Sequence, residues 1–412
     1  MISVDQIIEA YHNINSVVMK TPLMLNYNLS KKYECNIFLK REDMQVVRSF
    51  KIRGAYNKMK KMGTKARSGG VICASAGNHA QGVAFACSAL KTHCIIYMPT
   101  TTPNQKISKV KYFGGEWVEI RLIGDTFDDA NRVALQHSVD KQMPYIHPFD
   151  DEDVMAGQGT IAKEILDEMD VPVDVLIVAV GGGGLISGVG SYFKNVSPAT
   201  KIIAVEAEGA PALARSMEAN TLVRLDKIDS FADGIAVKIV GEKTFIICKE
   251  VIDEIKLVPE GKICSSILGL YNDEALVVEP AGAISFASLD YFKEEIKGKN
   301  VVIIVCGGNN DITRTEDIRE RALLWEGRKH YFIIRFPQRA GALRDFLNLL
   351  GPNDDISHFE YTKKTNRDTG PALVGLELKT SDDYLSLIER MNDSGINYEH
   401  LNNNPMLFEM FV

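Results

Sequence analysis

The segment SFKIRGA, residues 49–55, contains the first candidate for chemistry in this sequence. Lys51 follows an extended stretch and stands at the start of a predicted helix, where its positive charge opposes the helix dipole. A lysine amine is nucleophilic at neutral pH, and able to form a Schiff base, when it is desolvated or lies near another cation. Arg53 could be that cation. The segment alone is equally compatible with a solvated surface lysine.

A second candidate is ASAGNHAQG, residues 74–82, which lies between a predicted strand and a predicted helix. Small residues let the backbone approach a ligand closely, and the free amides at a helix N-terminus suit an anion. The alternative is an ordinary strand-to-helix turn, with Ser75 or Asn78 as the N-cap. The segment by itself leaves both interpretations open.

The segment GGGGL, residues 181–185, is more specific. It follows the apolar run 175–180 and precedes a helical pattern. Four consecutive glycines lose much backbone entropy on folding, which a mere turn would not require. Consecutive N–H groups at a helix N-terminus are typical of a phosphate-binding loop. The pattern differs from both GxxxxGK[ST] and GxGxxG.

Polar or reactive residues also follow two other predicted strands. The strand 301–306 ends in CGGNN, where Cys306 could be an inert core thiol. Glu206 and Glu208 follow the strand 202–206 and could be metal ligands. We favour solvated or structural carboxylates because no third acidic residue follows closely, so the sequence predicts no metal site.

Composition excludes several classes of function. The 412 residues have room for two or three domains, and 45% hydrophobic with 25% charged residues is ordinary for a soluble globular protein. A net charge of −7 predicts neither nucleic-acid binding nor membrane binding. The seven cysteines form no CxxC pair, which favours reduced thiols. The N-terminus lacks a signal-peptide pattern and the apolar runs are too short to span a bilayer, so we expect a cytoplasmic protein.

Short apolar runs alternate with amphipathic segments over most of the chain, which indicates βαβ units and an α/β fold with a mostly parallel sheet. The predicted strands are 37–40, 70–74, 94–98, 117–120, 175–180, 202–206 and 301–306. The predicted helices are 52–62, 79–90, 104–113, 127–136, 155–168 and 283–292. Ligands of such sheets usually bind beyond the carboxyl ends of the strands, where the glycine-rich and polar segments fall.

The pattern changes near residue 325. The charge-dense segment 314–328 predicts a helix that runs into a linker. The order that follows is strand 331–336, helix 340–350, strand 356–362, strand 371–379, helix 382–394 and strand 396–401. This β-α-β-β-α-β order is typical of a ferredoxin-like domain. We therefore expect a catalytic region over 1–325, with a small lobe of roughly 50–150 inserted in a large lobe, and a separate domain over 329–412.

Together and in this order, these segments resemble the fold-type II pyridoxal-phosphate (PLP) enzymes, which share a two-lobed fold like that of the tryptophan synthase β chain. More narrowly, they resemble the biosynthetic threonine dehydratases, also called threonine deaminases. SFKIRGA, ASAGNHAQG, GGGGL and CGGNN recur at the expected separations, and the resemblance covers essentially the whole chain. The C-terminal domain resembles the ACT-like domains of that family, which bind amino-acid effectors.

The resemblance implies a role for each segment. Lys51 would form the Schiff base with PLP, Asn78 would hydrogen-bond the 3-hydroxyl, and Cys306, where many relatives have serine, would contact the pyridine nitrogen. The phosphate would be held by Gly181, Gly182, Gly183, Gly184 and Leu185. The pocket for the substrate carboxylate would be lined by Ser75, Gly77, Asn78 and His79.

Two residues refine the implied chemistry. A neutral Cys306 cannot keep the pyridine nitrogen protonated as an aspartate would, and a less electrophilic ring favours prompt β-elimination over transamination. Ala76 stands where the similar serine racemases carry a serine base. Because alanine cannot accept or return a proton, racemisation is disfavoured.

The implied reaction is that of a threonine ammonia-lyase, a carbon–nitrogen lyase that converts L-threonine to 2-oxobutanoate and ammonia. This is the first step of isoleucine biosynthesis within branched-chain amino-acid biosynthesis. Allosteric control by isoleucine or valine would act through the ACT-like domain. Some relatives carry two such domains and this chain has room for one. A homo-oligomer, in particular a tetramer, is implied as well. The effector-binding candidates are Arg339, Ala340, Gly341, Ala342 and Leu343.

Three alternatives stay open at this point. The chain could be another eliminase or β-replacement enzyme of the same fold, such as a serine dehydratase, although the ACT-like domain and SFKIRGA weigh against this. It could be a catabolic, nucleotide-activated threonine dehydratase. It could also be an amino-acid sensor built on an inactive enzyme, which the intact Lys51 argues against.

Overall fold

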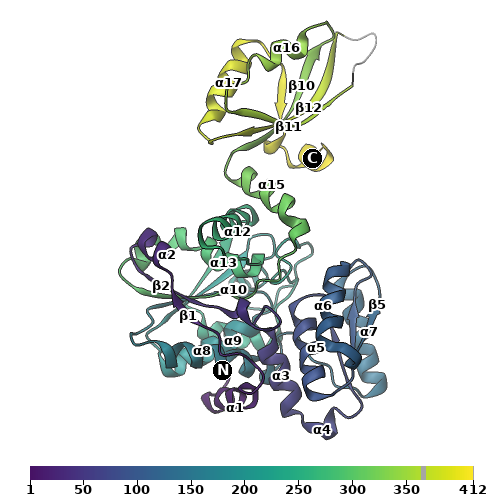
Figure 1. Cartoon of the computed structure of the whole chain (residues 1–412), viewed down its shortest axis with the longest axis vertical. Helices are drawn as coiled ribbons and strands as arrows, with labels where there is room; N and C mark the ends of the chain where they lie inside the picture. Colours follow the sequence, from purple (N-terminus) through teal and green to yellow (C-terminus); the bar gives the residue numbers. More distant parts are fainter. Residues whose placement is uncertain (363–367, 412) are drawn as a thin grey trace. The chain divides into compact units, whose positions relative to one another are not determined.

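A computed structural model describes residues 1–362 and 368–411, and the chain divides into two compact units (Figure 1). The larger unit contains Met1–Glu260 and Gly269–Asp311, and the smaller contains Gly261–Leu268 and the described residues from Ile312 onward. The sequence placed this boundary after residue 325. Helix α15 (Thr315–Trp325) instead groups with the smaller unit, because Glu320 on this helix pairs with Lys329 (2.8 Å) and accepts a hydrogen bond from Tyr331 (2.5 Å).

The larger unit consists of two lobes, each built on its own sheet. The large lobe has a six-stranded sheet in the order β1-β2-β9-β6-β7-β8, in which only the pair β1–β2 is antiparallel. Its strands are β1 (Leu23–Leu25), β2 (Asn36–Lys40), β9 (Asn300–Ile304), β6 (Val175–Ala179), β7 (Lys201–Ala207) and β8 (Glu254–Val258). The small lobe has three parallel strands, β3 (Val71–Ala74), β4 (Cys94–Met98) and β5 (Val118–Leu122).

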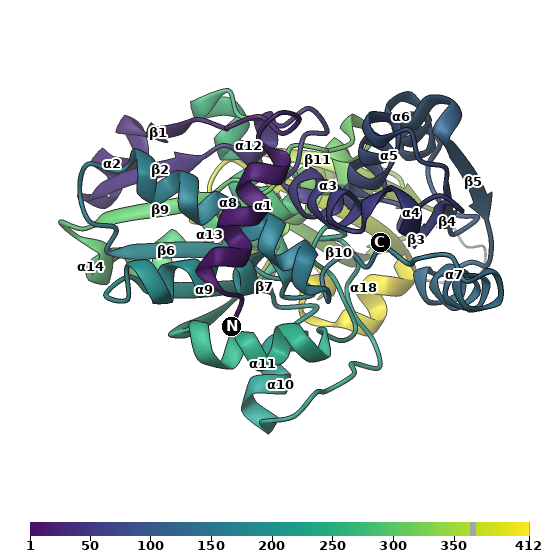
Figure 2. The same ribbon diagram turned by 90° about the horizontal axis from the view of Figure 1, so that it is seen from below.

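Helices cover both sheets, as expected for a mostly parallel α/β fold. In the large lobe α1, α8 and α9 pack against one another beside the sheet (Figure 2). The helices of the large lobe are α1 (Val4–Ile14), α2 (Tyr27–Tyr33), α3 (Lys51–Lys61), α8 (Glu152–Glu168), α9 (Gly184–Val196), α10 (Ala212–Ala219), α11 (Glu242–Val251), α13 (Pro280–Ala287) and α14 (Lys293–Ile296). Those of the small lobe are α4 (Gly63–Ala66), α5 (Asn78–Leu90), α6 (Asn104–Gly114) and α7 (Phe127–Lys141). Helix α12 (Glu260–Glu274) is divided between the two units, because Gly261–Leu268 group with the smaller one.

Strands that are mostly or fully buried are predicted well from the sequence, as β3, β4 and β6 show. Every residue of β3 and of β6 is buried, which explains their unbroken apolar runs. The sequence missed β1, which has only three residues, and β8, whose residues are mostly half-buried and alternate in polarity. The helix predicted over 283–292 begins earlier, at Pro280, because proline is well suited to the first turn of a helix.

Four charged side chains are buried together where α3 meets β2 and α8. Arg53 donates to both oxygens of Glu42 (2.7 and 2.8 Å) and to both oxygens of Glu164 (2.6 and 2.8 Å). Lys40 forms an ion pair with Glu164 (2.8 Å) and donates to the backbone carbonyl of Thr21 (2.7 Å). Two positive and two negative charges therefore balance inside the protein, and they fix the start of α3.

The smaller unit has a four-stranded antiparallel sheet in the order β11-β12-β10-β13. Its elements are β10 (Lys329–Pro337), α16 (Ala342–Leu347), β11 (Asp354–Tyr361), β12 (Thr369–Leu378), α17 (Asp383–Asp393), β13 (Tyr398–His400) and α18 (Pro405–Phe411). This is the ferredoxin-like arrangement. It has its own core, in which Phe332, Phe346 and Leu387 are fully buried. Among the described residues no helix is long and apolar enough to cross a membrane.

Candidate functional site

A narrow cavity in the larger unit, with an empty volume of about 450 Å³, brings the sequence-predicted segments together. It lies at the carboxyl ends of β6 and β9, and its walls come from both lobes. Lys51, Asn78, the segment from Gly181 to Leu185, and Cys306 all line it. This is the place in an open parallel sheet where ligands usually bind.

Lys51 reaches this cavity because the residues before it are tied to the end of β9. Ser49 forms a β-bridge with Gly307, and the Phe50 amide donates to the Cys306 carbonyl (3.2 Å). Helix α3 then begins at Lys51 and passes so close to α5 that a Cβ at Gly82 would lie 3.0 Å from the Lys51 carbonyl carbon. The amine donates to the backbone carbonyl of Pro148 (3.0 Å).

The surroundings of the Lys51 amine lower its pKa. Burial brings the pKa of Lys51 down to about 8, and the neighbouring Cys306 and Glu279 partly oppose the shift. From the sequence, Arg53 was a candidate for a nearby cation that could lower this pKa, but burial is the cause and Arg53 does not contribute. The Arg53 guanidinium points into the ion network with Glu42 and Glu164, so its charge is neutralised there.

The glycine segment forms part of the cavity wall, and it has no room for side chains. A Cβ at Gly182 would lie 2.3 Å from the Phe149 ring, and one at Gly184 would lie 2.8 Å from the Phe149 Cβ. Gly183 has φ +89°, a left-handed conformation that favours glycine, and it is the N-cap of α9. No described side chain caps this helix, and free amides at a helix N-terminus can bind an anion.

Residues at the start of α11 and in the segment before α8 hold the glycine segment in place. Thr244 Oγ1 donates to the Gly182 carbonyl (2.7 Å), and Asp150 accepts from the Lys243 and Thr244 amides (2.9 and 3.0 Å) at the start of α11. His147 Nδ1 in turn accepts from the Asp150 amide (2.8 Å), and burial lowers the pKa of His147 to about 4, which keeps it neutral. The sequence analysis missed these residues, since nothing in their spacing indicates that they meet the glycines.

Cys306 and Glu279 lie at the inner end of the cavity. Cys306 is buried, and burial raises the pKa of its thiol, so that the group stays protonated. Glu279 is also buried, and burial raises its pKa to about 7. A Cβ at Gly307 would lie 2.2 Å from Glu279 Oε1, which accounts for the first glycine of CGGNN. Glu279 was not predicted from the sequence, where its one distinguishing feature is that it is an isolated acidic residue at the end of an apolar stretch, directly before Pro280.

Of the residues predicted for the substrate, the structure brings Asn78 to the cavity wall but not the others. Ser75 Oγ accepts from the Gly77 amide (3.2 Å) and shapes the turn before α5. Beside Gly77, a Cβ would meet no heavy atom of the described chain within 4 Å, so this turn borders open space. His79 is buried with its Nε2 on the Ile146 carbonyl (2.8 Å), and burial lowers its pKa to about 3.

The predicted effector residues lie at the turn between β10 and α16. Arg339, Ala340, Gly341 and Leu343 are exposed, while Ala342 is buried. The Arg339 guanidinium forms an ion pair with Asp345 (2.6 Å), and Gly341, with φ +86°, is the N-cap of α16. The helix has six residues, which is shorter than the predicted segment 340–350.

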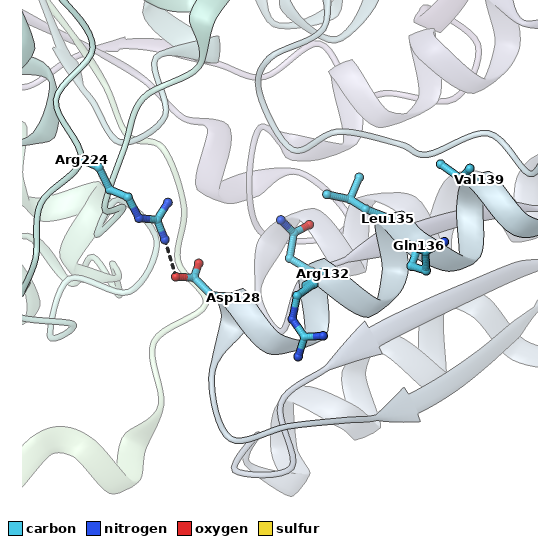
Figure 3. Close-up of a pocket in the computed structure, with 7 residues that line it drawn as sticks. Asp128, Arg132, Leu135, Gln136, Val139 and Arg224 are labelled. Atoms are coloured by element: carbon cyan, nitrogen blue, oxygen red, sulfur yellow. Dashed lines mark hydrogen bonds and ion pairs between the residues drawn. The ribbon is translucent and has the colours of Figure 1, made fainter.

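Two other features lie outside the cavity. Glu206 accepts from the Leu213 and Ala214 amides (2.9 and 2.7 Å), so it caps α10, and the described residues contain no cluster of three metal-binding side chains. A shallow, open depression of about 720 Å³ lies on the exposed face of α7 (Figure 3). At its edge Arg224 of the large lobe pairs with Asp128 of the small lobe (2.6 Å), which joins the lobes away from Lys51.

Comparisons with known proteins agree with this geometry. Residues 14–307 match the family described as pyridoxal-phosphate dependent enzyme, and residues 320–411 match the C-terminal regulatory domain of threonine dehydratase. The whole chain is 57% identical over 413 residues to a biosynthetic L-threonine dehydratase of Bacillus subtilis, of which it covers 98%. The processed form of threonine deaminase isoform 2 from Solanum lycopersicum superposes with a TM-score of 0.73 at 41% identity, over 78% of this chain and 90% of that one. Maize serine racemase superposes with a TM-score of 0.72 at 30% identity, over 78% and 98% of the respective chains.

Proposed function

The chain belongs to the pyridoxal-phosphate-dependent threonine dehydratases that carry a C-terminal regulatory domain, and from this premise we propose that it is a threonine ammonia-lyase. It converts L-threonine to 2-oxobutanoate and ammonia. The observation that carries the proposal is the single cavity that joins the Lys51 amine, the glycine segment and the Cys306 thiol. The test is an assay of the purified protein with PLP and L-threonine, in which 2-oxobutanoate and ammonia must appear in equal amounts.

The residues of the cavity fit PLP. The glycine segment offers backbone amides at the start of α9 to the phosphate, and any side chain there would meet Phe149. The Lys51 amine would hold the aldehyde carbon, and Asn78 would donate to the 3-oxygen. Cys306, a neutral thiol, would face the pyridine nitrogen. When bound, PLP supplies an electron sink that makes the Cα proton of an amino acid acidic.

Residues of the protein accept the proton and orient the substrate. Lys51 is the general base: with a pKa lowered to about 8, a useful fraction of the amine is neutral near physiological pH and can accept the Cα proton. The turn before α5, which borders open space at Gly77, orients the substrate carboxylate through backbone amides. Loss of the β-hydroxyl as water leaves an enamine, which tautomerises and hydrolyses to 2-oxobutanoate and ammonia.

We place the reaction in isoleucine biosynthesis, since relatives that are 57, 54 and 52% identical to the chain are named as biosynthetic enzymes. A cytoplasmic location is supported by the seven cysteines, which are buried and form no disulfide in the described structure, as in proteins of reducing compartments. We further propose a homo-oligomer, which gel filtration with light scattering would test.

Replacing Cys306 tests what faces the pyridine nitrogen. Cys306→Asp should place an ionised carboxylate there and keep the nitrogen protonated, so that Cα deprotonation becomes more reversible. We expect 2-oxobutanoate formation to fall by about tenfold, with exchange of the Cα proton or transamination increasing. Steady-state rates together with NMR detection of deuterium at Cα measure both effects.

Cys306→Ser is the matched control, because serine is also neutral and similar in size. Its elimination rate should stay within about threefold of the wild type. An aspartate variant that eliminates water as fast as the wild type, without added exchange, would contradict the placement of Cys306 at the nitrogen.

Deleting Ile312–Val412, the part of the smaller unit that follows the catalytic region, tests the regulatory role. The domain has its own core around Phe332 and Phe346, so its removal should leave PLP binding and elimination intact. In the full chain we expect isoleucine to raise the threonine concentration for half-maximal rate by about fivefold or more, because an effector that binds two states unequally shifts their balance. The truncated chain should show no shift.

Calorimetry with isoleucine and with valine on the full and truncated chains provides the control for binding. A full-length enzyme that releases no heat and shows no shift with either amino acid would contradict the regulatory proposal and leave the domain with a role in assembly only.

A further inference from the structure

Asn309 links the two lobes at the wall of the cavity. It follows the Cys306–Gly308 turn, and its Nδ2 donates both to the Val47 carbonyl (2.8 Å) and to Oδ1 of Asn78 (2.7 Å). Its Oδ1 accepts from the Lys109 ammonium group (3.1 Å). Asn78 on α5 and Lys109 on α6 belong to the small lobe, whereas Asn309 follows β9 of the large lobe.

These partners leave only one orientation for the Asn309 amide. The oxygen and nitrogen of an amide side chain have nearly the same shape, so the partners alone decide which way it points. The Val47 carbonyl can only accept a hydrogen bond, and the Lys109 ammonium group can only donate one. Asn309 must therefore turn Nδ2 towards Val47 and Oδ1 towards Lys109.

The orientation of Asn309 dictates that of Asn78. Because Asn309 presents a donor, Asn78 must meet it with Oδ1, which leaves Nδ2 as the donor of Asn78, a residue that lines the cavity. One hydrogen of this Nδ2 goes to Glu279 Oε1 (2.6 Å), and the other remains for a ligand. In the reverse orientation Asn78 would present oxygen to the Glu279 carboxyl group and to any ligand oxygen.

We propose that Asn309 is a positioning residue for the cofactor site: through its bond to Asn78 Oδ1, it holds the Asn78 N–H donors towards the 3-oxygen of PLP. Lys109 and Val47 fix Asn309 in turn. This network joins the two lobes through four side chains, those of Asn78, Lys109, Glu279 and Asn309. The Asn78 N–H donors are therefore held towards the cofactor only when the lobes are in contact. This inference rests on the proposed function through the assignment of Asn78 to the cofactor.

A double-mutant cycle on PLP binding tests the inference without any substrate. The variants are Asn78→Ala, Asn309→Ala and the double variant, and the measurements are the dissociation constant of PLP and the position of its visible absorption band after reconstitution. We expect each single change to weaken PLP binding by about tenfold, as loss of one charge-assisted hydrogen bond would. Because Asn309 acts through Asn78, the double variant should bind as the Asn78 variant does, and both single variants should shift the band alike.

Asn310→Ala is the matched control. In the described part of the chain the Asn310 Oδ1 accepts a hydrogen bond from the adjacent Asp311 amide (3.0 Å), which is local to the turn. The Asn310→Ala variant should therefore bind PLP as the wild type does. Circular dichroism and thermal unfolding check that each apoprotein folds. Should Asn309→Ala fail to fold, Asn309→Asp keeps the size and the Lys109 partner but lacks the donor, and it should weaken binding equally.

The outcomes separate this inference from the proposed function. If Asn78→Ala weakens PLP binding while Asn309→Ala does not, or if the two losses multiply, the inference is overturned and the proposed function stands. If Asn78→Ala has no effect, the assignment of Asn78 falls and the inference with it. A wild-type protein that binds no PLP would overturn both.

Discussion

Replacing Lys51 by alanine is expected to reduce the turnover of L-threonine by about 10³-fold or more, because the variant lacks both the amine that holds the cofactor and the general base. The amine contacts the Pro148 carbonyl and lies in the cavity, so its loss should leave the fold intact. The same change should remove the visible absorption band of lysine-bound PLP. Steady-state kinetics and absorption spectra of the purified variant measure the two effects.

Lys60→Ala is the control, since Lys60 lies on the same helix and is exposed. It should keep both the activity and the band. The pH dependence adds an independent check. The neutral amine is the nucleophile, so covalent uptake of PLP by the apoprotein should speed up as the pH rises towards about 8 and then level off. An alanine variant with more than a trace of activity would remove Lys51 from its assigned role.

Replacing Arg53 by methionine is expected to destabilise the larger unit by about 3–5 kcal/mol, because it leaves two carboxylates inside the protein without their main partner. Arg53 is fully buried, and although burial alone pulls its pKa down, the charges of Glu42 and Glu164 hold the pKa of Arg53 above its usual value. The unfolding midpoint of this unit in scanning calorimetry should fall by roughly 10 °C.

Two further variants show whether the buried charge is the cause. Arg53→Met combined with Glu42→Gln should recover part of the loss, because the two charges of the network that then remain buried, those of Lys40 and Glu164, pair with each other (2.8 Å). Arg215→Met removes an exposed pair with Glu218 (2.8 Å) and should change stability by less than about 0.5 kcal/mol. Equal effects of Arg53→Met and Arg215→Met would contradict the importance of the buried network.

Much of the fold follows from local patterns. The strands β4 and β6 and the helices α3, α5 and α6 begin or end within about two residues of their predicted positions, because buried apolar runs and amphipathic periods are local properties. The β-α-β-β-α-β order of the smaller unit was predicted for the same reason. Its last strand, β13, has only three residues, and the predicted strand 396–401 was too long because the chain turns into a short 3-10 helix at Leu401.

The sequence by itself indicated which chemistry is possible, because the resemblance of its segments to PLP enzymes implied a role for Lys51, for the four glycines and for Cys306. Only the tertiary structure decided how these residues act. The low pKa of Lys51 arises from burial and not from Arg53, whose charge is neutralised by Glu42 and Glu164. Glu279 and Asn309 meet Asn78 across 201 and 231 positions of sequence. Desolvation and hydrogen bonds between distant segments depend on the packed chain, and no local pattern encodes them.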